Sequence, residues 1–181
     1  NPNKIIYSAR GLPEQFAMFD YVDVGVRDGG AVTGLVPFYN NLIVFREKAI
    51  DMIQYTAAGD GKYSITTIST SIGTVAANSA AIVPNVGLCF LAKDGIYSIH
   101  GGTSGGATIE VNKISGSISE EMKRINVQAL ARATGVYSPK EGEYWVHYPA
   151  DGKERPNRGA VLHLPSKQWS LRNNDSKVED E

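Results

Sequence analysis

Apolar residues along this chain either alternate with polar ones or gather in short runs, and both kinds of segment end at turns rich in glycine, proline and asparagine. Alternation is typical of half-buried β-strands and short continuous runs of fully buried ones. The pattern predicts strands over residues 4–8, 21–24, 32–37, 42–46, 49–55, 63–69, 131–138, 143–148, 160–164 and 168–171, with a further set between 80 and 111. We therefore expect an all-β fold.

One segment departs from the strand pattern. Ser117 and Glu120 have the spacing of a helix capping box, in which each side chain bonds the other's backbone N–H. Ile118, Met122 and Ile125 follow at helical spacing. The sequence therefore predicts one short helix near residues 117–125.

The strand pattern repeats along the chain. Val36-Pro37 recurs as Val83-Pro84, the apolar run 42–45 recurs as 88–91, and the turn and strand that follow recur as well, with a period of about 47 residues. A third, degraded copy lies at residues 136–139. Periods of 40 to 50 residues built from short strands are typical of β-propellers, whose blades are four-stranded antiparallel sheets that stack on their neighbours. We expect a propeller-like fold of about three to four blades.

The repeat also predicts how the chain is divided. Blade-like units are expected over about residues 1–70, 71–116 and 126–172, followed by an acidic, flexible tail over 173–181. Three blades do not close a ring of the usual four to eight. We expect either that this chain lacks the rest of the propeller, in keeping with a first residue that is not Met, or that separate chains complete it.

Composition narrows the possible partners. The 181 residues are 42% hydrophobic and 20% charged, which is ordinary for a globular domain, and the net charge of -1 argues against a surface that grips nucleic acid tightly. No stretch approaches the roughly 20 apolar residues that cross a bilayer, so no membrane insertion is expected. The single cysteine, Cys89, lies in an apolar strand pattern and is expected to be a buried thiol.

Several segments match part of a catalytic or ligand-binding motif but lack the structural context or the spacing that the motif requires. Residues 102–106 match the Gly-x-Ser-x-Gly nucleophile motif around Ser104, but they lie between strands and not at a strand-to-helix turn. Residues 59–62 lack the spacing of a phosphate-binding loop. We expect ordinary loops at both places, and a surface or core role for the three histidines, His100, His147 and His163.

Clustered carboxylates and aromatic residues offer two further possibilities. A metal could be held between residues 20 and 30, by Asp20, Asp23 and Asp28 among Gly25, Gly29 and Gly30, but the spacing of a calcium loop is absent and a solvated acidic loop is favoured. Aromatic rings could stack on bases or sugars. Strand placement instead favours core and sheet-face positions for Tyr144, Trp145, Tyr148 and Trp169.

Taken in order, the residues resemble a known family. The segments that carry the resemblance are Ile5 to Ser8, Pro13 to Phe16, Val22 to Gly25, Leu35 to Phe38, Leu42 to Phe45, Ile50 with Ile53, Ile72-Gly73, and Leu88 to Tyr97 with its Asp94-Gly95 turn. They are similar to the propeller of tail nozzle proteins, the tail tubular protein B family of short-tailed bacteriophages. The resemblance covers about residues 4 to 100.

The resemblance implies a virion structural protein without catalysis, catalytic residues, cofactor or metal. Such proteins form a cyclic ring, expected here to be a hexamer, at the tip of the phage tail below an adaptor, and they enclose the channel through which double-stranded DNA leaves the capsid. Their outer surface can carry tail fibres or receptor-binding proteins. Structural roles are accordingly expected for the motif residues Pro13, Phe16, Asp23, Gly25, Pro37, Pro84, Asp94, Gly95 and Trp169.

Two other classes of function remain open. A propeller-type carbohydrate-binding or hydrolase module would hold its ligand at the central funnel with loop aromatics and carboxylates. A propeller of the host that binds other proteins is the third possibility. An enzyme needs polar groups that converge on one place, whereas the histidines of this sequence are scattered.

Overall fold

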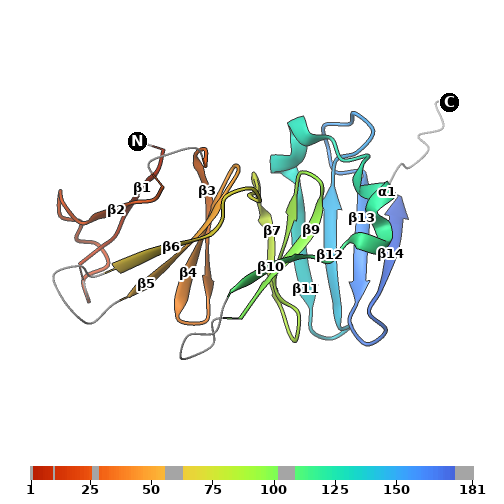
Figure 1. Cartoon of the computed structure of the whole chain (residues 1–181). Coiled ribbons are helices and arrows are strands. Elements are labelled where there is room, and N and C mark those ends of the chain that lie inside the picture. The colour runs from red at the N-terminus through yellow and green to blue at the C-terminus, as the bar shows by residue number, and fades with distance from the viewer. Residues whose placement is uncertain (1, 10, 26–28, 56–62, 102–108, 174–181) are drawn as a thin grey trace. The chain divides into compact units, whose positions relative to one another are not determined.

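The computed structural model describes residues 2–9, 11–25, 29–55, 63–101 and 109–173. The chain divides into two compact units, residues 1–73 and 74–181. The described residues form four antiparallel sheets and one short α-helix, so the expected all-β fold is confirmed (Figure 1).

The first unit contains a small hairpin and one four-stranded sheet. Strands β1 (Lys4–Ile6) and β2 (Tyr21–Asp23) pair with each other. The larger sheet has the order β3-β4-β5-β6, with each strand beside its neighbour in sequence. Its strands are β3 (Val32–Phe38), β4 (Asn41–Arg46), β5 (Ile50–Tyr55) and β6 (Tyr63–Ser69). This up-and-down order is that of a propeller blade.

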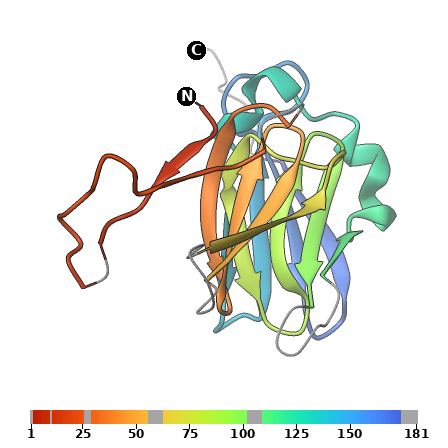
Figure 2. The same cartoon turned by 60° about the vertical axis from the view of Figure 1, so that its left-hand side comes forward.

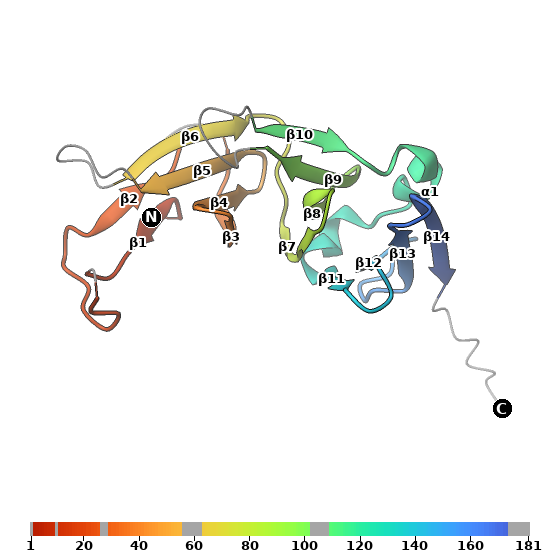
Figure 3. The same ribbon diagram turned by 90° about the horizontal axis from the view of Figure 1, so that it is seen from below.

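The second unit contains two further sheets of the same kind. One has the order β7-β8-β9-β10 and the other β11-β12-β13-β14 (Figure 3). Their strands are β7 (Ala76–Val83), β8 (Gly87–Ala92), β9 (Gly95–His100), β10 (Glu110–Lys113), β11 (Thr134–Ser138), β12 (Glu143–Tyr148), β13 (Arg158–His163) and β14 (Gln168–Asn173).

The two sheets of the second unit share one hydrophobic core. Cys89, Leu91 and Ile96 contribute to it from one sheet, and Tyr144 and Val146 from the other. Cys89 is completely buried, as expected, and burial raises the pKa of its thiol to about 12. The Tyr144 hydroxyl donates a hydrogen bond of 2.7 Å to the backbone carbonyl of Ser79 on β7. This bond connects the β11–β14 sheet to the β7–β10 sheet.

Helical turns connect these two sheets. A 3-10 turn, η1 (Gly116–Ile118), leads into the short helix α1 (Ser119–Met122), and a second 3-10 helix, η2 (Val127–Arg132), precedes β11. The short helix is confirmed, but the capping box is wrong, because the residue before α1 is Ile118 and no side chain caps it. The strand expected to begin at residue 131 begins at Thr134, since η2 occupies the preceding residues.

The repeated Val-Pro pairs mark the end of the first strand in each sheet. Pro37 is the next-to-last residue of β3, and Pro84 directly follows β7. In the turn after β3, the residue with a positive φ is Tyr39, at 53°. Asn41 begins β4, where its buried side chain accepts a 2.8 Å hydrogen bond from Gln54.

The Tyr144–Ser79 bond predicts a measurable contribution to stability. Tyr144→Phe leaves a buried carbonyl without its donor, which costs about 1–3 kcal/mol and is expected to lower the free energy of unfolding of the second unit by that amount, measured by urea denaturation. Tyr137→Phe is the matched control, because Tyr137 is the register partner of Tyr144 and packs against the same core. Equal stability of the two variants would contradict the assignment.

Candidate functional site

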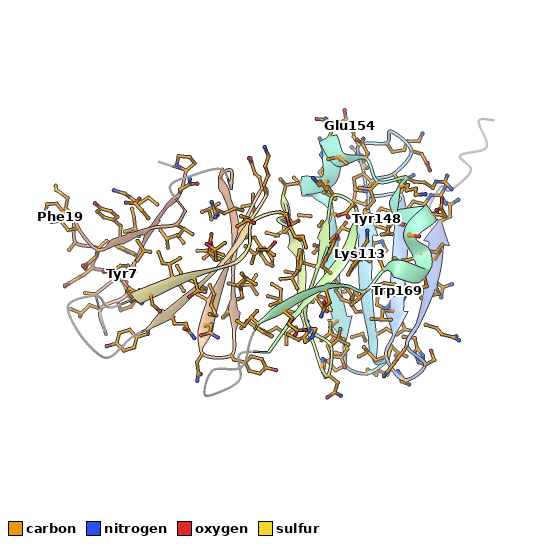
Figure 4. All side chains as sticks on the ribbon, viewed as in Figure 1. Tyr7, Phe19, Lys113, Tyr148, Glu154 and Trp169 are labelled. Carbon is orange, nitrogen blue, oxygen red and sulfur yellow. The ribbon has the colours of Figure 1, made fainter. Side chains whose placement is uncertain are left out.

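The most exposed apolar segment of the first unit lies between β1 and β2. Residues 11–19, here called the N-terminal arm, are all exposed, and Met18 and Phe19 keep 85% and 80% of their surface accessible. Leu12 and Phe16 are also about half exposed or more, at 48% and 60%. Figure 2 shows the arm projecting beyond the β3–β6 sheet, and Figure 4 labels Phe19 near its end. Exposed apolar clusters of this kind mark interaction sites.

Backbone hydrogen bonds give the arm a defined path. The Tyr7 amide donates to the Asp20 carbonyl at 3.0 Å, and the Ala9 amide donates to the Gln15 carbonyl at 2.8 Å. The Gln15 amide in turn donates to the Leu12 carbonyl at 3.0 Å. Pro13 and Phe16, the motif residues of the resemblance, both lie within this looped hairpin. The arm therefore presents its apolar side chains on a folded support.

The base of the arm is packed on the sheet. Ile5 of β1 and Val22 of β2 contact a small core formed by Val24, Val44 and Ile53. Tyr7 meets Tyr63 of β6 edge to face, with ring centroids 4.7 Å apart. Hydrophobic and aromatic contacts thus hold the hairpin against one face of the β3–β6 sheet.

A buried ion pair lies on the same face. Nε of Arg46, at the end of β4, is 2.7 Å from Oδ2 of Asp51 on β5, and their side chains are only 4% and 0% exposed. The Thr67 hydroxyl of β6 donates to Oδ1 of Asp51 at 2.6 Å. A buried charge is tolerated only when it is paired and hydrogen-bonded. This pair therefore links three neighbouring strands.

The glycine-rich loop after β2 closes over this ion pair. A Cβ added at Gly25 or Gly29 would overlap the Arg46 guanidinium, and one at Gly30 would overlap Glu47. Gly25 has φ +57°, and its carbonyl accepts a 3.5 Å hydrogen bond from Arg46. Gly25 and Gly29 therefore make room for a cationic side chain.

The carboxylates once considered for a metal do not share one environment. Asp23 ends β2 opposite Lys4, Asp20 accepts the Tyr7 amide through its carbonyl, and Asp28 lies outside the described residues. Among the residues that the structure describes, no group of three His, Cys, Asp or Glu side chains is placed to hold a metal ion.

The Asp94-Gly95 turn between β8 and β9 is fixed by side chains. Asp94 Oδ2 accepts hydrogen bonds from the Tyr97 hydroxyl at 2.8 Å and from Nζ of Lys113 at 3.1 Å. Partial burial acts to raise the pKa of Asp94, but the bonds from Lys113 and Tyr97 outweigh it and hold the pKa below its usual value. A Cβ at Gly95 would meet the side chains of Ser115 and Lys113. Side-chain hydrogen bonds and close packing thus fix the shape of this turn.

Sequence reasoning missed a charged cluster that holds α1 to the loop after β12. Arg124 donates two hydrogen bonds to the Asp151 carboxylate, at 2.8 and 2.7 Å, and Arg158 donates a third at 3.1 Å. The Arg124 bond is the main cause that lowers the pKa of Asp151. Glu121 of α1 accepts a 3.4 Å hydrogen bond from the Tyr148 hydroxyl. Because these residues are distant in sequence, no local motif signals the cluster.

The aromatic residues occupy different environments. Tyr144 and Tyr148 are completely buried in the core, as expected, and the Trp169 indole donates a 3.0 Å hydrogen bond to the Ile114 carbonyl. Trp145 points to the opposite face of its strand and stacks on His147, with an interplanar angle of 8°. The alternation of β12 thus separates core tyrosines from a half-buried aromatic pair.

The histidines are not brought together. His100 lies on β9 beside Glu110, with Nε2 3.5 Å from the carboxylate. His147 and His163 lie on β12 and β13, and their register partners are Gly159 and Glu143, so they sit at different ends of that strand pair. The loops around Ser104 and at residues 59–62 lie outside the described residues.

The buried ion pair gives a stability prediction. Asp51→Ala leaves the Arg46 guanidinium buried without its anion, so the sheet is expected to lose about 3–5 kcal/mol, measured by hydrogen exchange of the β4 and β5 amides. Replacing both residues by apolar ones, as in Arg46→Met with Asp51→Leu, is expected to restore much of the protection. Glu120→Ala, at the exposed pair with Lys123, is the control and should change stability by less than about 1 kcal/mol. If the β4 and β5 amides exchange at the same rate in Asp51→Ala as in the unmodified protein, the ion pair does not link these strands.

The Asp94 turn gives a pH prediction. Because its folded-state pKa is lowered, Asp94 stabilises the fold above the unfolded value of about 3.9, and this contribution disappears as the pH falls through the folded pKa. NMR titration of its carboxyl carbon is expected to give a value below about 3.9, and Lys113→Met should raise that value. Titration of the unmodified protein at or above the ordinary value would refute the assignment.

Comparison with protein-family models gives no match for this sequence, and comparison with curated proteins gives none either. Among the described residues, no helix is long and apolar enough to span a membrane.

Proposed function

We propose that this chain is a structural protein of the virion of a short-tailed bacteriophage, and that it forms part of the tail nozzle around the channel for DNA ejection. The proposal combines the resemblance over residues 4 to 100 with the three up-and-down four-stranded sheets, each of which has the strand order of a propeller blade. The chain works in this proposal as a building block and not as an enzyme.

The observation that carries the proposal is the N-terminal arm. Its tip exposes Phe16, Met18 and Phe19, whereas its base is packed and hydrogen-bonded. Keeping such side chains in water forgoes the free energy of their burial, about 1.5–3 kcal/mol for each large apolar side chain. A protein that works within an assembly recovers this free energy at an interface. The Pro13–Phe16 motif of the resemblance lies on the same arm.

The charge balance supports a conduit for DNA. A lumen rich in Lys and Arg would hold DNA through counterion release, which strengthens with each neutralised phosphate. The net charge of -1 for 18 basic and 19 acidic residues gives no such excess. Double-stranded DNA is thus a passing partner in this proposal. The lasting partners are further copies of the chain, the tail adaptor, and tail fibres or receptor-binding proteins.

The proposal predicts a closed cyclic assembly. Native mass spectrometry and particle images of the purified chain are expected to show a ring with one fixed copy number, six in our expectation, because protein rings close by a single repeated interface. A monomer at every concentration would contradict the proposal. A monomer that also binds glycans saturably would favour the carbohydrate-binding alternative instead.

A further inference from the structure

Strand β6 forms one edge of the β3–β6 sheet. Among the described residues it pairs with β5 alone (Figure 3). Residues 65–67 in its middle are exposed, with Ile65 keeping 39% of its surface accessible, and Tyr55 at the end of β5 keeps 60%. An edge strand directs the N–H and C=O groups of alternate residues away from its sheet, where they can bind a further strand. The β6 edge therefore offers both backbone groups and apolar surface to a partner.

The β6 strand lacks the features that usually protect an edge, which are charged residues, proline and short length. Its seven residues, Tyr63–Ser69, include no charge, proline or glycine. The last strands of the other four-stranded sheets differ, because β10 has four residues with Glu110 and Lys113 and β14 contains Arg172. Among the first strands, β3 contains Pro37, and β7 and β11 approach each other closely. Of these edges, β6 is thus the one best suited to strand pairing.

The sequence of β6 is complementary to itself. Its pairing with β5 is regular from Tyr63 to Thr67, and the register shifts beyond that point. An antiparallel pair of two β6 strands centred on Ile65 places this residue opposite its own copy. Tyr63 then lies opposite Thr67, and Ser64 lies opposite Thr66. Pairs of β-branched residues, of an aromatic with a β-branched residue, and of two hydroxyls all stabilise antiparallel strands, and no like charges meet.

This register also has twofold symmetry, because a residue that faces its own copy lies on the axis. The axis is perpendicular to the sheet, so Ile65 points to the same face in both copies. On that face, Leu42, Ile53 and Ile65 form a row across β4, β5 and β6. The row would continue through Ile65, Ile53 and Leu42 of the second copy. The added strand would therefore cover the exposed side of Ile65 with the side chain of another Ile65.

We infer that β6 of one copy pairs antiparallel with β6 of a second copy, with Ile65 at the centre. The pair occupies the free β6 edge of both copies, so it stops at two. It differs from the interface that closes a ring, because neighbours in a ring of more than two copies are not related by a twofold axis. The inference therefore goes beyond the proposed function and holds whether or not a ring forms.

Disulfide trapping tests the pair. Mild oxidation of Ile65→Cys is expected to give covalent dimers and no larger species on a non-reducing gel, because each copy supplies one cysteine opposite its own copy. Opposite Cα atoms in an antiparallel pair lie about 4.5 or 5.5 Å apart, which a disulfide can span. Cys89 does not interfere, since it is buried and its thiol pKa is raised to about 12. The matched control is Ile82→Cys, at a 51% exposed position on β7, which should give no dimers.

A mixture of two variants tests the register. Ser64→Cys chains and Thr66→Cys chains, one of them lengthened by a tag, are expected to cross-link to each other, because these positions lie opposite in the antiparallel pair. Each variant alone should cross-link poorly, since its own two cysteines are offset along the strands. Equal yields from the mixture and from the single variants would contradict this register.

A charged substitution tests the contact without a cross-link. Ile65→Lys places like charges directly opposite each other, which destabilises a strand pair. The dissociation constant of the paired species, measured by analytical ultracentrifugation, is expected to rise about tenfold or more. Ile82→Lys is the control and should leave it unchanged.

The outcomes separate this inference from the proposed function. Rings without dimers of Ile65→Cys would overturn the β6 pair and leave the proposed function standing. Dimers without rings would support the pair and contradict the proposed function. Dimers of Ile82→Cys in equal yield would show random collision and overturn the pair. A chain that forms neither dimers nor rings contradicts both proposals.

Discussion

Burial on both faces of the central strands is the constraint on which this structure depends. Residues 43–45 of β4 and 88–91 of β8 are completely buried, although side chains in a strand point alternately to opposite faces. Other parts of the protein must therefore cover both faces of each of these sheets. In the second unit, the two sheets cover each other's inner faces, and in the first unit, the hairpin of β1 and β2 covers part of one face. Among the apolar side chains that stay exposed, Met18 and Phe19 of the arm keep the largest exposed fractions, 85% and 80%.

Polar side chains set the geometry within which this burial occurs. Arg46 and Asp51 link neighbouring strands of the first sheet, Tyr144 bonds the backbone of β7, and the Asp151 cluster holds the helical connection. Each of these groups joins segments that are distant in sequence. Gly25 and Gly29 contribute as well, because without a Cβ their backbone can approach the Arg46 guanidinium. These polar contacts thus stabilise the fold at specific points.

The repeat and the apolar runs predicted the strands well, because central strands such as β4 and β8 are continuous apolar segments with turn residues on both sides. Local motifs predicted less. The Ser117–Glu120 pair does not cap a helix, because η1 occupies residues 116–118 and α1 begins only at Ser119. The strand expected to begin at residue 131 begins at Thr134, because η2 occupies the preceding residues. The exposed arm was not predicted, although the run Phe16-Ala17-Met18-Phe19 is a signal that could have identified it, because its apolar residues lack polar alternation and lie outside the expected strands.

The central claim is that another copy covers the arm. Hydroxyl-radical footprinting with mass spectrometry tests it on the unmodified chain, whose three methionines differ in exposure: Met18 is 85% exposed, Met52 is 8% exposed and Met122 is 1% exposed. The account predicts that Met18 oxidises rapidly in dilute, dissociated protein but almost as slowly as Met52 and Met122 at concentrations where rings form. Rapid oxidation of Met18 in both states would show that its surface stays in water, and would contradict the account.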